Sequence, residues 1–225
     1  MASIAFTHPQ SGANLGESFA VQRIVCIGRN YAEHTREMGN DPERDPPIFF
    51  FKPLTALNQS GVFVCPGYSK QVEHELELVV AVGEGGADLS EAAAQRAVVG
   101  FGLGLDMTCR DSQREAKDKG LPWDLAKGFD GSAPITPLVK AGFEHLQALG
   151  EMTLDRNGET CQRGHWQGMI WSIPELLMQV SRSVTLVPGD LVFTGTPGGV
   201  ARVTAGDALL GRLEGLPHTL TVEVR

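Results

Sequence analysis

The chain has 225 residues, 42% of them hydrophobic and 20% charged, which is ordinary for a globular protein with one sizeable core. Its formal net charge of −8 argues against nucleic acid or an anionic membrane surface as a partner. No apolar run approaches the roughly 18 residues of a membrane-spanning helix, and the N-terminus shows no signal-peptide pattern.

The cysteines lie far apart in the sequence, at Cys26, Cys65, Cys109 and Cys161. None of them forms a Cys-x-x-Cys spacing, which argues against a zinc knuckle and against a disulfide framework. We expect Cys26 to be a small buried hydrophobic residue, because its neighbours are aliphatic. A reducing, cytoplasmic compartment is the corresponding expectation.

The first half of the chain is predicted to combine strands with one short helix. Residues 1–20 are polar and without a sustained period, and they are expected to form an N-terminal arm or a short starting strand. A strand is predicted over 23–27 and an apolar strand over 48–51. Between them, Asn30 caps a predicted helix from Tyr31 to about Met38.

After residue 83, the chain is predicted to contain three further short helices among many short strands. Asn157-Gly158 is a hairpin signal, and three glycines in the strand over 98–107 indicate close backbone packing or a bulge. The helices are expected over 91–97, after a Ser90 cap, over 108–119 and over 173–181. The balance is β-rich without the regular alternation of a Rossmann sheet, so we expect an α+β fold with a single domain over 21–225.

An acidic strand over 72–83 is the most unusual stretch. In a strand, Glu73, Glu75 and Glu77 point to one face, because side chains alternate between the two faces. Carboxylates in a row repel one another, and glutamate has a poor strand propensity. A solvated edge face is the ordinary explanation.

Asp106 interrupts another strand that is predicted to be buried. An unpaired buried carboxylate is costly, so Asp106 should meet a cation or several donors; the alternative is a helix cap just before Thr108. Together with Glu75 and Glu77, Asp106 would form an oxygen-only site. Such a site suits Mg²⁺ or Mn²⁺ better than zinc.

His34 and Glu37 lie three residues apart on the predicted helix and therefore share a face. A carboxylate beside an imidazole fixes its tautomer and raises its basicity, as a water-activating general base requires. An exposed helix with an incidental ion pair has the same spacing.

Two further features concern charge stabilisation. Lys127 lies in an apolar setting, where a lysine stabilises a developing oxyanion, although a surface lysine is the commoner case. The glycine-rich turn over 194–200 follows a strand and offers hydroxyls and backbone amides to an anion. It lacks the lysine of a P-loop, and a plain turn is the alternative.

Five motifs, in this order, resemble the fumarylacetoacetate hydrolase superfamily. They are Gly-Arg-Asn-Tyr-x-x-His-x-x-Glu at 28–37, Glu-x-Glu at 75–77, Leu-Asp-Met-Thr at 105–108, Gly-Leu-Pro-Trp-x-x-Ala-Lys at 120–127 and Thr-Gly-Thr-Pro at 194–197. The resemblance covers 21–225 and implies a mixed, rolled β-sandwich with a few short helices, assembled as a homodimer.

The same resemblance implies the roles of individual residues. His34 and Glu37 match the water-activating pair, and Lys127 matches the lysine that stabilises the oxyanion. The divalent ion is assigned to Glu75, Glu77 and Asp106. The keto-acid end of the substrate is assigned to Arg110, Gln113 and Thr196.

Two stretches, 37–53 and 167–171, are similar to the fumarylpyruvate hydrolases of gentisate degradation within this superfamily. They imply hydrolysis of 3-fumarylpyruvate to fumarate and pyruvate. The run over 164–167 departs from that pattern, which would alter the preferred acyl group if it lines the distal pocket. Candidates to bind the distal carboxylate of the substrate are Arg29, Arg44, Lys52 and His165.

The alternatives keep the site and change the reaction. A broad acylpyruvase and an oxaloacetate decarboxylase both need a stabilised pyruvate enolate. An isomerase of unsaturated keto acids would not need His34, so its presence with Glu37 favours hydrolysis. A non-catalytic binding module would not need the acidic and basic residues of the site.

Overall fold

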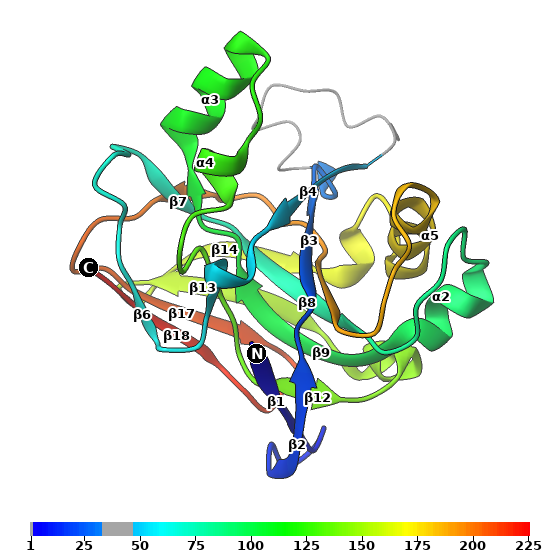
Figure 1. The fold of residues 1–225 in the computed structure, drawn as a ribbon. Coiled ribbons are helices and arrows are strands. Elements are labelled where there is room, and N and C mark those ends of the chain that lie inside the picture. Colours follow the sequence, from blue (N-terminus) through cyan, green and yellow to red (C-terminus); the bar gives the residue numbers. More distant parts are fainter. Residues whose placement is uncertain (1, 33–46) are drawn as a thin grey trace.

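A mixed eight-stranded sheet forms the centre of the computed structural model, which describes residues 2–32 and 47–225. Figure 1 shows this sheet with the helices around it. Its strand order is β2-β1-β12-β9-β8-β15-β3-β4. The strands are β1 (Ser3–Thr7), β2 (Asn14–Ala20), β3 (Arg23–Gly28), β4 (Ile48–Lys52), β8 (Leu76–Val82), β9 (Val98–Leu105), β12 (Leu138–Lys140) and β15 (Asp190–Phe193).

The N-terminal residues belong to this sheet. β1 pairs with β12 in parallel and with β2 in antiparallel orientation. Residues 1–20 were expected to form an arm or a short starting strand, and the structure shows the strand. The helix expected after Asn30, from Tyr31 to about Met38, lies largely outside the described residues. The strands expected over 23–27 and 48–51 are confirmed as β3 and β4, which pair antiparallel.

A five-stranded sheet packs against one face of the large sheet. Its strands are β6 (Val62–Phe63), β13 (Glu151–Arg156), β14 (Glu159–His165), β17 (Ala208–Leu213) and β18 (Leu220–Val224). The hairpin predicted at Asn157-Gly158 is confirmed between β13 and β14, with positive φ at both residues, as a type I′ turn requires. The sheets touch closely at Gly211, where a Cβ would lie 3.1 Å from Leu76 and Leu103 side-chain atoms.

Two small sheets complete the β-structure around the site. β7 (Val72–His74) lies between β10 (Thr108–Cys109) and β16 (Ala201–Arg202), and β5 (Leu57–Asn58) pairs with β11 (Ala133–Pro134). The acidic strand is therefore interrupted: its first residues belong to β7 in a small sheet, and its remainder is β8 in the centre of the large one.

The helices form close to the predicted positions. α2 (Glu91–Ala97) begins at the Ser90 cap, and α5 (Ile173–Ser183) begins with a capping box and Pro174. α3 (Arg110–Lys119) starts two residues later than predicted, because Thr108 and Cys109 pair with β7, and it ends at Gly120 with φ of 64°. α4 (Asp124–Lys127) is a single turn. Single-turn or 3₁₀ segments occupy Leu54–Ala56, Phe143–Ala148 and Trp166–Gly168.

The large sheet has apolar cores on both faces. Leu76 and Leu78 of β8 join a cluster with α2, α5 and the five-stranded sheet, whereas Val79 and Ala81 join a second cluster with β1, β3 and β15. Every residue of β8 is buried. The acidic strand is therefore not the solvated edge that its composition alone suggests. Cys26 is fully buried, as predicted.

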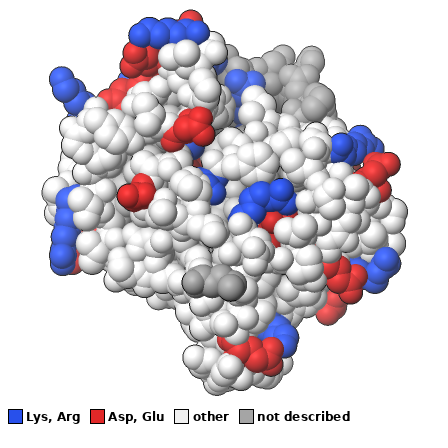
Figure 2. Space-filling model, viewed as in Figure 1, with Lys and Arg blue, Asp and Glu red and all other residues white. Residues whose placement is uncertain are grey.

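The surface carries charges of both signs. Figure 2 shows lysine and arginine interspersed with aspartate and glutamate on the face it presents. No helix in the described part of the chain is long and apolar enough to cross a membrane.

Candidate metal centre and pocket

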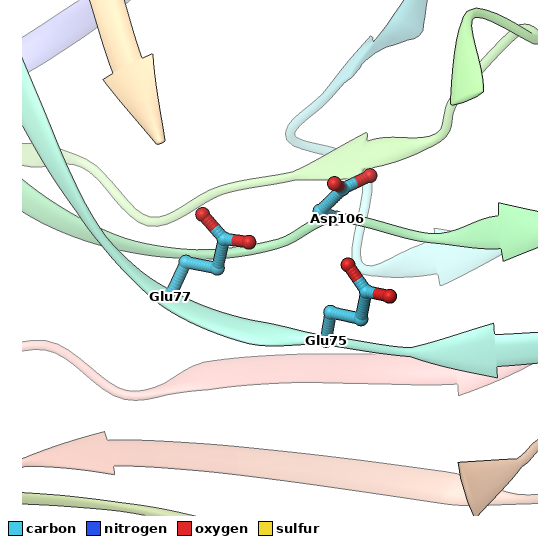
Figure 3. Close-up of side chains that lie close together, drawn as sticks. All are labelled: Glu75, Glu77 and Asp106. Carbon is cyan, nitrogen blue, oxygen red and sulfur yellow. The ribbon is translucent and has the colours of Figure 1, made fainter. Parts of the chain in front are cut away.

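Three buried carboxylates meet where β8 begins and β9 ends. Glu75 lies in the break between β7 and β8, Glu77 is in β8, and Asp106 directly follows β9. The antiparallel register brings them together, because it places Leu76 opposite Leu105, and the amide of Asp106 donates a 2.9 Å hydrogen bond to the Glu75 carbonyl. One oxygen from each carboxylate lies within 4.8 Å of the others, and the three side chains turn toward one another (Figure 3).

Gly104 in β9 leaves room for the ring of Phe193 beside the carboxylates. Gly104 lies opposite Glu77, and a Cβ on Gly104 would lie 2.6 Å from Phe193. The close packing predicted from the glycines of this strand is confirmed here. The helix cap considered for Asp106 is not found, because the residue that precedes α3 is Cys109.

Buried lysines balance part of the acidic charge. Lys127 Nζ lies 2.8 Å from Glu75 Oε2 and 2.7 Å from Asp106 Oδ2, and it donates a 2.6 Å hydrogen bond to Thr108 Oγ1. Burial alone would lower the pKa of Lys127, but Asp106 and Glu75 outweigh it and raise that pKa. The side chain therefore stays an ammonium ion beside the carboxylates.

Lys52 is the second buried lysine. Its Nζ lies 2.8 Å from Asp106 Oδ1 and donates hydrogen bonds to the carbonyls of Lys127 and Met107 and to Ser132 Oγ. The contact with Asp106 is electrostatic, since Oδ1 has no hydrogen-bond partner among the described residues. Lys52, one of the candidates for the distal carboxylate of a substrate, is not among the pocket-lining residues, and its ammonium group contacts these partners of the protein itself.

Glu77 keeps the least compensated charge. Its Oε2 accepts a 2.8 Å hydrogen bond from the Gly195 amide, and no described lysine or arginine forms an ion pair with it. Burial, and then the charges of Asp106 and Glu75, raise the pKa of Glu77 well above its ordinary range. One of the amides predicted in the glycine-rich turn, that of Gly195, thus binds a carboxylate of the protein itself.

A divalent cation fits this site. One oxygen from each carboxylate lies within 4.8 Å of the others, and Glu77 lacks a cationic partner in the described part of the chain. Asp106 Oδ1 has an ionic contact with Lys52 but no hydrogen-bond partner among the described residues. Hard cations such as Mg²⁺ and Mn²⁺ prefer carboxylate oxygens. The residues that would hold the ion are Glu75, Glu77 and Asp106.

Arg110 links α3 to the carboxylates. Its guanidinium lies 2.5 Å from Glu75 Oε1 and 2.6 Å from Glu73 Oε2, and it donates a 2.5 Å hydrogen bond to Gln113 Oε1. Gln71 donates a further hydrogen bond to Glu73. The solvated face that is the ordinary explanation for these glutamates is wrong for Glu73 too: it is 9% exposed, because Arg110 neutralises it and Gln71 donates a hydrogen bond to it.

A pocket of about 530 Å³ opens above Glu75 and Asp106, two of the three carboxylates. Its lining contains Arg29, Arg110, Gln113 and Lys127, all predicted as site residues, together with Glu75 and Asp106. The remaining lining residues are Ile27, Gly28, Phe50, Gln71, Glu73, Arg114, Lys117, Asp118, Trp123 and Val200. His34, Glu37 and Arg44 lie outside the described residues.

Arg29 is held at the pocket by its neighbour. Arg29 has a positive φ of 62°, which is uncommon outside glycine and is found at functional sites. The side chain of Asn30 donates hydrogen bonds to the carbonyls of Thr194 and Trp171 and accepts one from the Trp171 amide. These bonds fix the turn that presents Arg29.

Thr196 and His165 lie elsewhere. Thr196 Oγ1 donates to the Leu76 carbonyl and accepts from Gln162 Nε2, both at 2.9 Å, and Thr196 is not among the pocket-lining residues. None of the residues over 164–167 lines the pocket either, and His165 Nδ1 accepts from the Gln167 amide.

Gln162 is a structural residue that the sequence did not reveal. Its Oε1 lies 2.8 Å from His74 Nδ1 and accepts a 3.0 Å hydrogen bond from the Leu76 amide, on either side of Glu75. Its Nε2 donates to Thr196 Oγ1 and to the Pro197 carbonyl. Gln162 therefore joins the two ends of the strand break to the glycine-rich turn. A buried glutamine in a mostly solvated hairpin gives no local sign of this role.

The sequence around Lys52 does indicate that this lysine is buried beside an acidic residue. It follows three phenylalanines in an apolar strand, and a lysine at the end of such a strand is expected to be buried only if it meets acidic partners. The acid it meets, Asp106, lies 54 positions further along the chain.

Comparisons with known proteins agree with this geometry. The family profile described as "Fumarylacetoacetate (FAA) hydrolase C-terminal" matches residues 23–224. A fumarylpyruvate hydrolase from Pseudomonas aeruginosa, solved in complex with Mn²⁺ and pyruvate, superposes with a TM-score of 0.89 at 41% identity, covering 100% of this chain and 96% of that one. The putative fumarylpyruvate hydrolase from Burkholderia cenocepacia superposes with a TM-score of 0.84 at 42% identity, covering 99% and 90%.

A second group of relatives has a different name. The mitochondrial oxaloacetate tautomerase FAHD1 of Homo sapiens is 43% identical over 197 residues, which are 87% of this chain and 88% of that protein. The sequence match and the structural match both extend over most of the chain. The protein therefore belongs to the fumarylacetoacetate hydrolase family.

Proposed function

We propose that this protein is a divalent-metal-dependent hydrolase that cleaves the carbon–carbon bond of an acylpyruvate, with 3-fumarylpyruvate as substrate and fumarate and pyruvate as products. The observation that carries the proposal is the set of three buried carboxylates, of which Glu75 and Asp106 line a pocket that also contains Arg110 and Lys127. The similar structure that holds Mn²⁺ and pyruvate supports the same assignment.

The chain's own residues supply binding and charge stabilisation. Arg110 and Gln113 are fixed to each other at the carboxylate end of the pocket, where we assign them to the keto-acid end of the substrate. Lys127 Nζ is held beside Glu75 and Asp106, and its positive charge would stabilise an oxyanion on the attacked carbonyl. A divalent ion at these carboxylates would supply Lewis-acid stabilisation of the departing pyruvate enolate.

Water activation is assigned to His34, oriented by Glu37. The imidazole removes a proton from water, the resulting hydroxide adds to the distal carbonyl, and the carbon–carbon bond then breaks toward pyruvate. The departing enolate takes up a proton to become pyruvate, so one water is consumed for each acid and pyruvate formed.

The test of this assignment is the variant His34→Ala. Hydrolysis is measured as the decrease in diketo-acid absorbance with Mg²⁺ or Mn²⁺ present. The variant should lose hydrolysis by about 100-fold or more while metal binding, measured by calorimetry, stays close to that of the unchanged protein. Turnover near the original rate in His34→Ala would overturn the assignment.

Oxaloacetate tautomerisation is the second candidate, and the 43% identical human relative favours it. Tautomerisation moves a proton between carbon and oxygen and consumes no water, so it does not need a water-activating pair. Assays with oxaloacetate and with fumarylpyruvate under the same conditions separate the two functions. A protein that interconverts the oxaloacetate tautomers and releases no pyruvate from fumarylpyruvate would be a tautomerase.

A further inference from the structure

One face of α3 lines the pocket from its buried end to its mouth. Arg110, Gln113, Arg114 and Lys117 all contribute to the lining, and their spacing of three and four residues places them on one side of the helix. Arg110 is buried, whereas Arg114 and Lys117 are exposed. Along the helix axis, Arg114 lies about 6 Å and Lys117 about 10 Å beyond Arg110.

The inner cation of this row is already neutralised. Arg110 forms ion pairs with Glu73 and Glu75, so its charge belongs to the carboxylate end of the pocket. It has two acidic partners and one amide partner, and it is 4% exposed. A substrate carboxylate at the outer end of the pocket needs a different cation.

Arg114 is held over the pocket by a neutral partner. Its Nη2 donates a 2.6 Å hydrogen bond to Gln71 Oε1, and Gln71 in turn donates a 2.6 Å hydrogen bond to Glu73 Oε1. An amide fixes the guanidinium without cancelling its charge. Gln71 thus connects the outer arginine to the same acid that Arg110 neutralises.

The outer cations have no acidic partner in the part of the chain that the structure describes. Neither Arg114 nor Lys117 forms an ion pair there, although Asp118 also lines the pocket. By contrast, Lys119 on the same helix pairs with Glu115 at 2.6 Å, outside the pocket lining. Figure 2 shows charged side chains of both signs at the outer end of α3.

We propose that Arg114, positioned by Gln71 and followed by Lys117, binds a second carboxylate at the far end of the acyl group. This inference rests on the proposed function and deepens it: the preferred substrates are acylpyruvates whose acyl group ends in a carboxylate. Arg114 is then a specificity-determining residue, because an arginine forms paired, charge-assisted hydrogen bonds with a carboxylate. An uncharged acyl group leaves this interaction unmade.

The experiment compares the kcat/KM values for fumarylpyruvate and acetylpyruvate, whose acyl groups differ in the terminal carboxylate. Arg114→Gln should lower the ratio of these values by about 10-fold or more, since charge-assisted hydrogen bonds are lost, with the change mainly in KM for fumarylpyruvate. Arg114→Lys should recover part of the ratio. Lys119→Gln is the matched control, since it removes a cation from the same helix outside the pocket lining, and it should keep the ratio.

A binding measurement separates the two proposals. In the His34→Ala background, calorimetry with each acylpyruvate reports affinity without turnover, and adding Arg114→Gln should weaken fumarylpyruvate binding about 10-fold relative to acetylpyruvate. If the unchanged protein cleaves neither compound, the proposed reaction fails, while this selectivity in binding still decides the role of Arg114. An unchanged ratio in Arg114→Gln, in both kinetics and binding, would overturn the inference.

Discussion

The backbone amide of Gly195 donates a 2.8 Å hydrogen bond to Oε2 of Glu77. The turn that follows β15 therefore stabilises a carboxylate of the metal centre. Gly195 has φ of 100°, and a Cβ there would lie 2.7 Å from the Cβ of Asn30. Only glycine fits this position without moving the turn.

Gly195→Ala should therefore damage both stability and metal binding. The left-handed backbone costs an alanine about 1 kcal/mol, and the contact with Asn30 adds to that cost and displaces the amide from Glu77. Gly206→Ala is the matched control, because Gly206 also has a positive φ of 97° but nothing within 4 Å of its added Cβ. Urea denaturation and Mn²⁺ calorimetry should show a stability loss in both variants and weaker metal binding only in Gly195→Ala. Equal metal affinities would contradict this role of the turn.

Glu77→Gln should affect the stability of the metal-free protein and the stability gained on metal binding in opposite directions. Replacing a buried, poorly compensated carboxylate by an amide should raise the free energy of unfolding of the metal-free protein at pH 7. In the unchanged protein, metal at 100 times its dissociation constant should add about 2.7 kcal/mol of stability. Thermal unfolding with EDTA and with Mn²⁺ should show most of this gain lost in Glu77→Gln. An undiminished metal-induced rise in Tm would remove Glu77 from the ligand set.

Lys52 is predicted to be a structural counter-ion of Asp106. Lys52→Met leaves a buried carboxylate short of one positive charge and removes three hydrogen bonds, so we expect a loss of about 3 kcal/mol. Lys140→Met provides the comparison, because Lys140 pairs with Glu17 on the exposed surface and should cost less than about 1 kcal/mol. Urea titrations that give equal losses for both variants would argue against the buried ion pair.

His218, which contacts the first strand of the chain, is expected to make the stability of the protein depend on pH. Its Nε2 lies 2.8 Å from Thr7 Oγ1 of β1, and burial lowers the pKa of the imidazole. A depressed pKa in the folded state means that the unfolded chain takes up the proton first. This contribution to stability is therefore complete above the ordinary value of about 6.5 and is lost as the pH falls below it toward the lower folded pKa.

His218→Gln should accordingly show a shallower fall in the free energy of unfolding between about pH 7 and pH 5. The measurement is urea denaturation at closely spaced pH values for both proteins. Identical slopes in the two proteins would mean that His218 does not titrate differently on folding.

Local chemistry in the sequence predicted many of the elements. The Ser90 cap, Pro174 and the Asn157-Gly158 turn each act over a few residues, and each is found where it was predicted. The start of α3 was misplaced because a short strand pairing with β7 takes its first two residues. Such pairing depends on a distant segment and leaves no local signal.

The site was predictable to the extent that motifs name its residues. The alternation of side chains grouped Glu73 with Glu75 and Glu77, and only the folded chain shows Glu73 paired to Arg110, 37 positions away. The role of Lys52 depends likewise on Asp106, which a different strand places beside it. Long-range ion pairs of this kind are set by tertiary packing, and so composition and periodicity do not reveal them.

Hydrolysis of fumarylpyruvate is tested by product analysis after incubation with the metal-loaded protein, with the EDTA-treated protein and with His34→Ala. We expect equal amounts of fumarate and pyruvate, formed only by the metal-loaded protein with His34 intact. If no metal-dependent pyruvate release is found from fumarylpyruvate or from any other acylpyruvate tested, the protein is not an acylpyruvate hydrolase.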